Sequence, residues 1–302
     1  MIFSVVVPTL NAGDSWSLWI EAIKSQSCAP DNTLIIDSCS TDDTVKLSEE
    51  AGFTVQVLPP GTFNHGRTRQ QAVLQCHNHD VVIFLTQDAI LADVHALQNI
   101  LLPFEDKSVM AVCGRQLPRK HATLIEAHAR RYNYSSKSFT RSIKDASKFG
   151  LKTAFMSNSF AAYRVSALNE ISGFPDNVIF GEDMYVAARI LKADYKTAYA
   201  ADACVYHSHD YSLLQEMKRY FDMGVFHARE PWLRREFGGA EGEGVKFIIS
   251  ELKYLLKHSL WRIPEGVIRA ILRYVGFRLG LMEKGLPLWL KKNLAMNKSY
   301  FK

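Results

Sequence analysis

The sequence lacks the long apolar segments that membrane-spanning and secreted proteins carry. Its 302 residues contain no uncharged apolar stretch of roughly eighteen residues, the length that a transmembrane helix requires. The chain starts with a strand-like apolar run, without the basic region and hydrophobic core of a secretion signal. With 47% hydrophobic and 22% charged residues, the composition is that of a globular protein. We therefore expect a cytoplasmic protein.

Cysteine is also scarce, and its pattern argues against a disulfide or zinc framework. The five cysteines are odd in number and form no C-x-x-C pair: Cys28, Cys39, Cys76, Cys113 and Cys204. This pattern favours free thiols in a reducing compartment. No nucleic-acid recognition motif accompanies the net charge of +5, so we expect no nucleic-acid partner.

Acidic residues are few near the C-terminus. Residues 246–302 contain twelve lysines and arginines against three glutamates, a net charge of +9. Two sets of apolar residues recur there at helical spacing: Ile248, Ile249, Leu252, Leu255, Leu256 and Leu260, then Val267, Ile268, Ile271, Leu272, Val275 and Leu279. Such basic amphipathic helices either contact an anionic membrane surface, or form a helical cap or an oligomer interface. We expect a main domain at residues 1–230 and a basic helical region at 231–302.

Apolar runs and helical patterns alternate through the first two thirds of the chain. Strands are predicted at Ile2–Val7, Thr33–Ile36, Thr54–Leu58, Val81–Leu85 and Met110–Gly114, and helices at Ser15–Ser25, Asp42–Glu50 and Thr68–Cys76. This alternation predicts an α/β fold with a mostly parallel sheet and right-handed crossovers. We expect Asp14 to cap the first helix, Thr123–Lys152 to lie outside the core over a pocket, and only helices after residue 212.

Polar segments that contain aspartate follow three of the predicted strands. They are Pro8–Asn11, Asp37–Asp43 and Thr86–Ala89. Ligands of open α/β sheets bind beyond the carboxyl ends of the strands, so these segments indicate one pocket. Asp37 could accept a hydrogen bond from the ring N–H of a pyrimidine, and the hydroxyls after it could bind phosphate. The alternative is a cluster that caps the next helix.

Asp88 is a candidate metal ligand. It follows five apolar residues and has no basic neighbour in sequence, so it would suit Mg²⁺ or Mn²⁺ bound also by the oxygens of a diphosphate. The alternative is a helix cap, which Asp93 would provide better. His207 and His209 lie on one face of an extended segment, where they either complete such a metal site or are polar residues at a strand end.

Glu182 and Asp183 follow Gly181 at the start of a predicted helix. Acidic residues in a first turn complement the helix dipole, which is the plain structural explanation. A tight turn at Gly181 would also present a carboxylate to the pocket, where it could act as a general base.

Three motifs, Val5–Asn11, Ile36–Thr44 and Gly181–Asp183, occur in an order that resembles the inverting family 2 glycosyltransferases, whose fold is the nucleotide-diphospho-sugar transferase (GT-A) fold. Two further segments, Phe63–Arg69 and Thr86–Ala89, are similar to the bacterial rhamnosyltransferase branch of that family. In this branch Gln-Asp-Ala stands where other members carry Asp-x-Asp. The resemblance covers about residues 3–230. We expect the C-terminal helical region to follow this domain.

The resemblance implies roles for residues of the donor site. Thr9, Asn11 and Asp37 would hold the nucleoside. Arg69 would approach the donor diphosphate, and Gln87 would belong to the nucleotide-sugar site.

The resemblance also implies a metal and a base. Asp88 would hold Mg²⁺ or Mn²⁺, with His207 preferred to His209 as the second protein ligand. Asp183 would deprotonate the acceptor hydroxyl, with Glu182 as the alternative base, in a single displacement with inversion.

For this branch the implied donor is dTDP-β-L-rhamnose and the implied product is an α-linked rhamnoside. The acceptor would be a saccharide, such as a lipid-linked surface polysaccharide or O-antigen precursor. The protein would reach it by peripheral contact with the inner face of the plasma membrane. The alternatives are another nucleotide sugar, such as a UDP-hexose, or a non-catalytic module that binds glycans or nucleotide sugars. Arg67 and Gln70 depart from the usual residues of the family and affect the fine geometry of the donor site.

Overall fold

The computed structural model describes residues 1–239 and 242–301, and its centre is one sheet of nine strands in the order β3-β2-β1-β4-β8-β6-β9-β5, with β7 paired to β9. The first four strands of this order are parallel: β3 (Thr54–Val57), β2 (Asn32–Asp37), β1 (Phe3–Thr9) and β4 (Val81–Leu85). They match the strands predicted from the apolar runs. Their carboxyl ends therefore lie at one edge of the sheet.

The second half of the sheet mixes strand directions. The long strand β9 (Lys196–Tyr206) runs parallel to β6 (Val109–Leu117), while β8 (Phe160–Arg164) is antiparallel to both β4 and β6. Two short strands, β5 (Ile90–Leu91) and β7 (Phe139–Arg141), are antiparallel to β9. The expected α/β fold with a mostly parallel sheet is confirmed, and its antiparallel strands were not predicted.

Alternate residues of the central strands point into two apolar layers. Val5, Val7 and Ile83 pack with α1 (Trp16–Lys24) and α4 (Ala96–Leu101) on one face. Val6 and Phe84 pack on the other face with α3 (His65–Gln75), α7 (Val165–Glu170) and α8 (Glu182–Lys192). Because both faces are covered, these strands are apolar throughout, which is why short apolar runs identified them.

Two helix starts differ from the sequence expectations. Asp14 does not cap α1, because a 3-10 turn at Gly13–Ser15 leads directly into the helix and Ser15 occupies the capping position. Helix α3 begins at His65, three residues before the predicted start, because the Asn64 side chain accepts hydrogen bonds from the backbone N–H groups of Gly66 and Arg67. Helix α2 (Thr44–Glu50), which precedes α3, lies where it was expected.

The segment Thr123–Lys152 belongs to the fold more fully than the sequence suggested. It contains α5 (Leu124–Asn133), the edge strand β7 and the short helix α6 (Ala146–Phe149). Tyr134 and Leu151 are buried in the main apolar cluster. The expectation that this segment lies outside the core was therefore wrong for these residues, whose apolar side chains are interspersed among polar ones.

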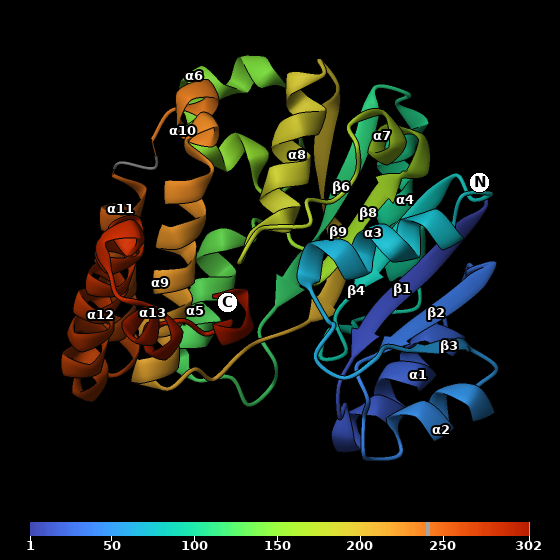
Figure 1. Cartoon of the computed structure of the whole chain (residues 1–302), viewed down its shortest axis with the longest axis horizontal. Coiled ribbons are helices and arrows are strands. Elements are labelled where there is room, and N and C mark those ends of the chain that lie inside the picture. The colour runs from blue at the N-terminus through green and yellow to red at the C-terminus, as the bar shows by residue number, and fades with distance from the viewer. Residues whose placement is uncertain (240–241, 302) are drawn as a thin grey trace.

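After β9 the described chain is helical, as expected. The helices are α9 (Leu213–Arg229), α10 (Pro231–Phe237), α11 (Glu243–His258), α12 (Ile263–Leu281) and α13 (Leu288–Leu294). Figure 1 shows α9 between the sheet and α12, which lies at the outer edge. The backbones of α9 and α12 approach closely at Gly224 and Gly280, where an added Cβ at Gly280 would lie 2.2 Å from the carbonyl oxygen of Phe221. The domain boundary at residue 230 stays a prediction.

No helix in the described residues is long and apolar enough to cross a membrane. All five cysteines are free thiols, as their spacing predicted.

Candidate active site

The ends of β1 and β2 are joined by side-chain hydrogen bonds. The Thr9 hydroxyl donates to Asp37 Oδ1 at 2.9 Å, and the backbone N–H of Ser40 donates to Asp37 Oδ2 at 2.7 Å. Asn11 Oδ1 accepts a hydrogen bond from the backbone N–H of Thr41 at 2.7 Å. The structure thus brings Thr9, Asn11 and Asp37 together. Asp43 stands at the N-cap of α2, and Asp42 accepts a hydrogen bond from the backbone N–H of Thr44, so part of the cluster does serve the start of that helix. The role of Asp37 in binding a nucleoside stays a prediction.

Gln87 links the loop after β4 to the loop after β1. Its Oε1 accepts a hydrogen bond from the backbone N–H of Leu10 at 2.7 Å, and its Nε2 donates to the carbonyl of Leu10 at 3.1 Å. This double contact fixes the loop after β4 and with it the neighbouring Asp88. In the structure Gln87 is thus a positioning residue, and its role in binding a nucleotide sugar stays a prediction.

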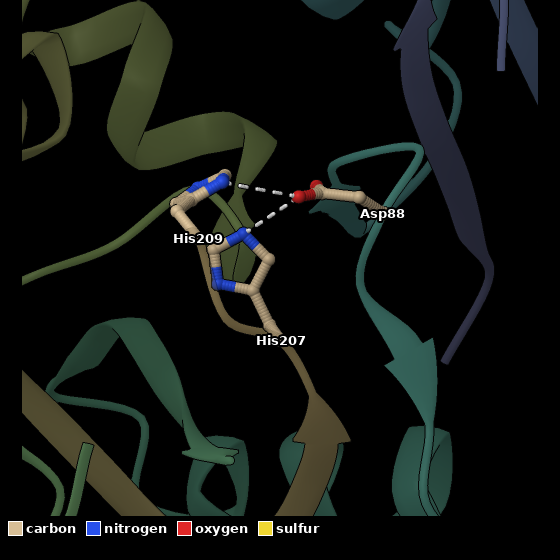
Figure 2. Close-up of side chains that lie close together, drawn as sticks. All are labelled: Asp88, His207 and His209. Atoms are coloured by element: carbon tan, nitrogen blue, oxygen red, sulfur yellow. Dashed lines mark ion pairs between the residues drawn. The ribbon is translucent and has the colours of Figure 1, made fainter. Parts of the chain in front are cut away.

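Asp88, His207 and His209 converge on one point, as Figure 2 shows. Asp88 Oδ2 lies 3.3 Å from His207 Nε2 and 3.5 Å from His209 Nδ1. Asp88 comes from the loop after β4, and the histidines follow β9, so strands far apart in sequence build the group. Asp88 serves no helix cap, whereas Asp93 accepts a hydrogen bond from the backbone N–H of His95 ahead of α4.

The hydrogen bonds around His207 leave one nitrogen available to a metal. Gln116 Nε2 donates to Ser157 Oγ, so Gln116 Oε1 faces His207 Nδ1 at 2.9 Å and accepts its proton in a hydrogen bond. The other nitrogen, Nε2, then carries a lone pair. It is buried without a hydrogen-bond partner and faces a carboxylate oxygen. Two electron-pair donors facing each other, one of them buried, fit a bound cation, and an amide that accepts the proton of the other ring nitrogen and so fixes the tautomer is typical of metal-binding histidines.

The electrostatics of this group suit metal binding as well. Burial lowers the pKa of His207, and burial together with His207 lowers the pKa of His209 to about 3. Burial opposes ionisation of Asp88, but the nearby rings of His207 and His209 outweigh it and hold its pKa well below the usual range. Neutral imidazoles and an ionised carboxylate are the forms that bind metal.

Glu182 and Asp183 lie in the first turn of α8, as predicted, after Gly181 in the left-handed conformation (φ 75°). Glu182 is buried, and its Oε1 lies 3.1 Å from Arg69 Nη1 and accepts a hydrogen bond from Asn158 Nδ2. Asp183 is partly exposed and accepts hydrogen bonds from the backbone N–H groups of Asn158 and Met184. The two adjacent carboxylates therefore have different surroundings.

These surroundings move the two pKa values in opposite directions. Burial opposes ionisation of Glu182, but the Arg69 guanidinium outweighs it and lowers the pKa of Glu182. Burial and then the negative charge of Glu182 raise the pKa of Asp183 to about 7. A partly exposed carboxyl group with a pKa near neutrality has the properties of a general base, whereas Glu182 is an anion held in an internal ion pair.

Arg69 pairs with a carboxylate of α8. Its side chain is buried, and besides Glu182 it donates to the carbonyl of His65 at 3.0 Å. The guanidinium therefore serves the carboxylate pair in this structure. Its role at the donor diphosphate stays a prediction.

Sequence reasoning gave no role to Gln116 or Asn158. Gln116 stands near the end of β6, so the rule that polar residues at strand ends form the pocket would have found it. Asn158 is held by the Tyr163 hydroxyl, which donates to Asn158 Oδ1 at 2.7 Å, and it contacts both carboxylates of α8. No pattern of spacing indicates that link.

Residues 4–172 match the family described as "Glycosyl transferase family 2". The chain belongs to this family. Helix α8 with its carboxylate pair lies beyond the matched residues. As a member of the family, the protein is a glycosyltransferase.

Similar proteins of known name cover the chain from end to end. It is 47% identical over 302 residues to the "O-antigen chain rhamnosyltransferase RfbN" of Salmonella typhimurium, which covers 100% of this chain and 96% of the relative. It is 46% identical over 300 residues to the "O-antigen chain rhamnosyltransferase WbaN" of Salmonella anatum, over 99% of this chain and 95% of the relative.

Solved structures support the fold. The mannosyltransferase PcManGT from Pyrobaculum calidifontis, in complex with GDP-Man and Mn²⁺, superposes with a TM-score of 0.64 at 15% identity, over 94% of this chain and 88% of that one. TarS 1–349 of S. aureus gives 0.56 at 16% identity, over 98% and 84%. These similarities confirm the GT-A fold expected from the motifs.

Proposed function

We propose that this glycosyltransferase transfers L-rhamnose from dTDP-β-L-rhamnose, with inversion, to an O-antigen precursor. The observation that carries the proposal is the 47% identity over the whole chain to a relative named an O-antigen chain rhamnosyltransferase. This similarity extends over the whole chain rather than over an isolated motif. The alternative donor class, UDP-hexoses, has no comparable support.

The acceptor side of the reaction depends on Asp183. Its partly exposed carboxylate would take the proton of the attacking hydroxyl as that oxygen bonds to the anomeric carbon and the bond to the diphosphate breaks on the opposite face. The backbone N–H groups of Asn158 and Met184 hold both oxygens of Asp183, which fixes the direction of the carboxylate. One displacement inverts the anomeric configuration, from β-linked donor to α-linked product.

The donor side depends on the strand ends. Thr9, Asn11 and Asp37 would bind the nucleoside at the ends of β1 and β2. Asp88 and His207 would hold Mg²⁺ or Mn²⁺, with His209 beside them. When bound, the divalent cation supplies positive charge next to the departing nucleoside diphosphate.

The cellular site follows from the acceptor. A lipid-linked precursor lies in a membrane, so we propose that the protein acts in the cytoplasm, in peripheral contact with the inner face of the plasma membrane.

A donor panel tests the proposed function. Purified protein with Mg²⁺ and a rhamnose-accepting oligosaccharide is given dTDP-β-L-rhamnose, dTDP-glucose, UDP-glucose or UDP-galactose, and release of the nucleoside diphosphate is measured. We expect turnover with dTDP-β-L-rhamnose at least about a hundredfold above the others, because the sugar pocket selects at the transition state. Faster turnover with a UDP-hexose would overturn the proposal.

A further inference from the structure

Helix α12 directs Arg269 and Arg273 inward and exposes much of its apolar side. Arg273 is buried and donates to Glu216 of α9 and to Glu251 of α11, and Arg269 Nη1 lies 2.6 Å from Glu216 Oε2. Three glycines, Gly266, Gly276 and Gly280, complete the inward side. The sequence left open whether the apolar residues of this region face a membrane or form a helical cap or an oligomer interface, and it did not predict that Arg273 is buried.

The outward side of the α11–α12 hairpin forms an apolar surface. We call it the outer face, and its members are all exposed: Leu256, Leu260, Trp261, Val267, Ile268, Ile271, Tyr274, Val275 and Met282. The indole of Trp261, at the corner between the helices, is 94% exposed. Fourteen of the twenty-five exposed large hydrophobic side chains in the described chain fall between Val245 and Met296. Such a concentration marks a surface that something covers.

Between Val245 and Met296, the charges that remain unpaired at the surface are positive. The three acidic residues of this segment are removed from solvent or neutralised: Glu251 and Glu283 are buried in ion pairs with arginine, and Glu265 pairs with Arg262 and Arg269. Lys253, Lys257 and Arg278 remain exposed beside the outer face. An apolar strip flanked only by positive charge matches the surface of an anionic bilayer, where acyl chains lie under negative headgroups.

A second copy of the chain would fit this surface less well. In a two-fold symmetric interface the same patch meets itself, so the exposed lysines and Arg278 would approach one another without an acidic partner. Like charges placed together weaken such an interface, whereas anionic headgroups neutralise them. Exposed tryptophan at a helix corner is also typical of the boundary between water and membrane.

The outer face begins close to the candidate metal group. Contacts pair Tyr211 with Arg269 and Phe221 with Gly280, so α9 and α12 run parallel and their N-terminal ends lie together. Arg269 Nη1 donates to the carbonyl of Tyr211 at 2.9 Å, and the ring of Tyr211 stacks on His209 with centroids 5.0 Å apart. In Figure 1 this is the end of α9 that receives the chain from β9.

We infer that the outer face of α11 and α12 rests on an anionic lipid bilayer, with Trp261 inserted at the interface, and that it holds the active site next to the membrane surface. This placement would give the active site access to a lipid-linked acceptor, and that purpose rests on the proposed function. The binding to lipid does not.

Vesicle co-sedimentation of the full chain tests the inference without any turnover. We expect the protein to pellet with phosphatidylglycerol–phosphatidylethanolamine vesicles at low salt, less at high salt, and little with phosphatidylcholine alone. The double variant Trp261→Glu/Ile271→Glu should bind at least about tenfold more weakly. Its matched control is Leu18→Glu/Leu74→Glu, which changes two exposed apolar residues on α1 and α3 and should bind like wild type.

A second pair of variants isolates the charge. Lys253→Glu/Lys257→Glu should lower binding to the anionic vesicles by about tenfold or more, whereas Lys24→Glu/Lys46→Glu, with the same change in net charge on exposed lysines, should change it little. The inference is overturned if the wild-type protein stays in the supernatant at low salt. It is also overturned if a variant and its control lose vesicle binding equally. A wild-type dimer in light scattering that Trp261→Glu/Ile271→Glu dissociates without any vesicle binding would overturn it too and would assign the surface to a second copy.

The transfer assay keeps the two proposals apart. Trp261→Glu/Ile271→Glu should retain wild-type turnover with a short soluble acceptor and lose turnover with a lipid-linked one. A wild-type chain that binds vesicles but transfers no rhamnose would refute the proposed function and leave the membrane surface standing.

Discussion

Adjacent carboxylates on α8 are held in different ionisation states by their neighbours. Arg69 and Asn158 bind Glu182, and the resulting buried anion disfavours a second negative charge on Asp183. Asp183 is left partly exposed with only backbone donors on its oxygens. The pair thus has one structural member and one member suited to proton transfer.

The pKa of about 7 at Asp183 leads to a pH dependence. Below that pH the carboxyl group is protonated and cannot accept the hydroxyl proton, so kcat should fall about tenfold per pH unit and level off above pH 7. Asp183→Asn should lower kcat by about 10² to 10⁴-fold, leave donor affinity nearly intact and abolish the acidic limb. Initial rates between pH 5 and 9 measure both.

The matched control for this prediction is Asp176→Asn, an exposed aspartate on the loop before α8. It should keep the wild-type rate and the wild-type pH profile. Undiminished turnover of Asp183→Asn would remove Asp183 from the reaction and leave Glu182 as the candidate base.

Asp88 should matter only when a metal is present. The facing lone pairs of His207 Nε2 and Asp88 Oδ2 would hold a cation, which would supply positive charge to the donor diphosphate. Asp88→Ala should weaken binding of dTDP by about tenfold or more in Mg²⁺ or Mn²⁺, yet change binding little in excess chelator. Calorimetric titration under both conditions measures this, with Asp202→Ala, exposed on β9, as the control. Equal losses with and without metal would make Asp88 structural.

At the scale of the elements, the contact between α9 and α12 depends on the absence of side chains. An added Cβ at Gly280 would lie 2.2 Å from the carbonyl oxygen of Phe221 and 2.8 Å from the Cα of Gly224. Because both neighbours are backbone atoms, the helices must move apart to accept it. Movement here also disturbs the buried ion pairs of Glu216 with Arg269 and Arg273.

Gly280→Ala should therefore destabilise the protein by about 1–3 kcal/mol, despite the better helix propensity of alanine. Gly285→Ala is the matched control, because an added Cβ there meets nothing within 4 Å, and it should change the free energy of unfolding by less than about 0.5 kcal/mol. Urea unfolding followed by circular dichroism compares the two. Equal midpoints for both variants would contradict the close packing of α12 against α9.

Across the whole molecule, the sequence predicted what depends on local pattern. Apolar runs such as Val81–Leu85 lie in a sheet covered on both faces, so they identified the parallel strands. The rule that ligands bind beyond the carboxyl ends of parallel strands predicted that Thr9, Asp37 and Asp88 lie at one edge of the sheet. The free cysteines and the helical C-terminal region followed from spacing alone.

What the sequence did not predict depends on contacts between distant segments. The inward arginines of α12 could not be assigned a side, because their partners Glu216 and Glu251 stand on two other helices. The pairing of Arg69 with Glu182, more than a hundred residues away, leaves no pattern in the sequence. Gln116 and Asn158 act through such contacts too.

The stereochemistry of the product tests the central claim most directly. Protein, Mg²⁺, dTDP-β-L-rhamnose and a soluble oligosaccharide acceptor are incubated, and the new anomeric centre is assigned by NMR from its one-bond carbon–proton coupling. A single displacement assisted by Asp183 predicts an α-L-rhamnoside, formed together with one equivalent of dTDP. A β-linked rhamnoside, or hydrolysis of the donor without transfer, would contradict the account.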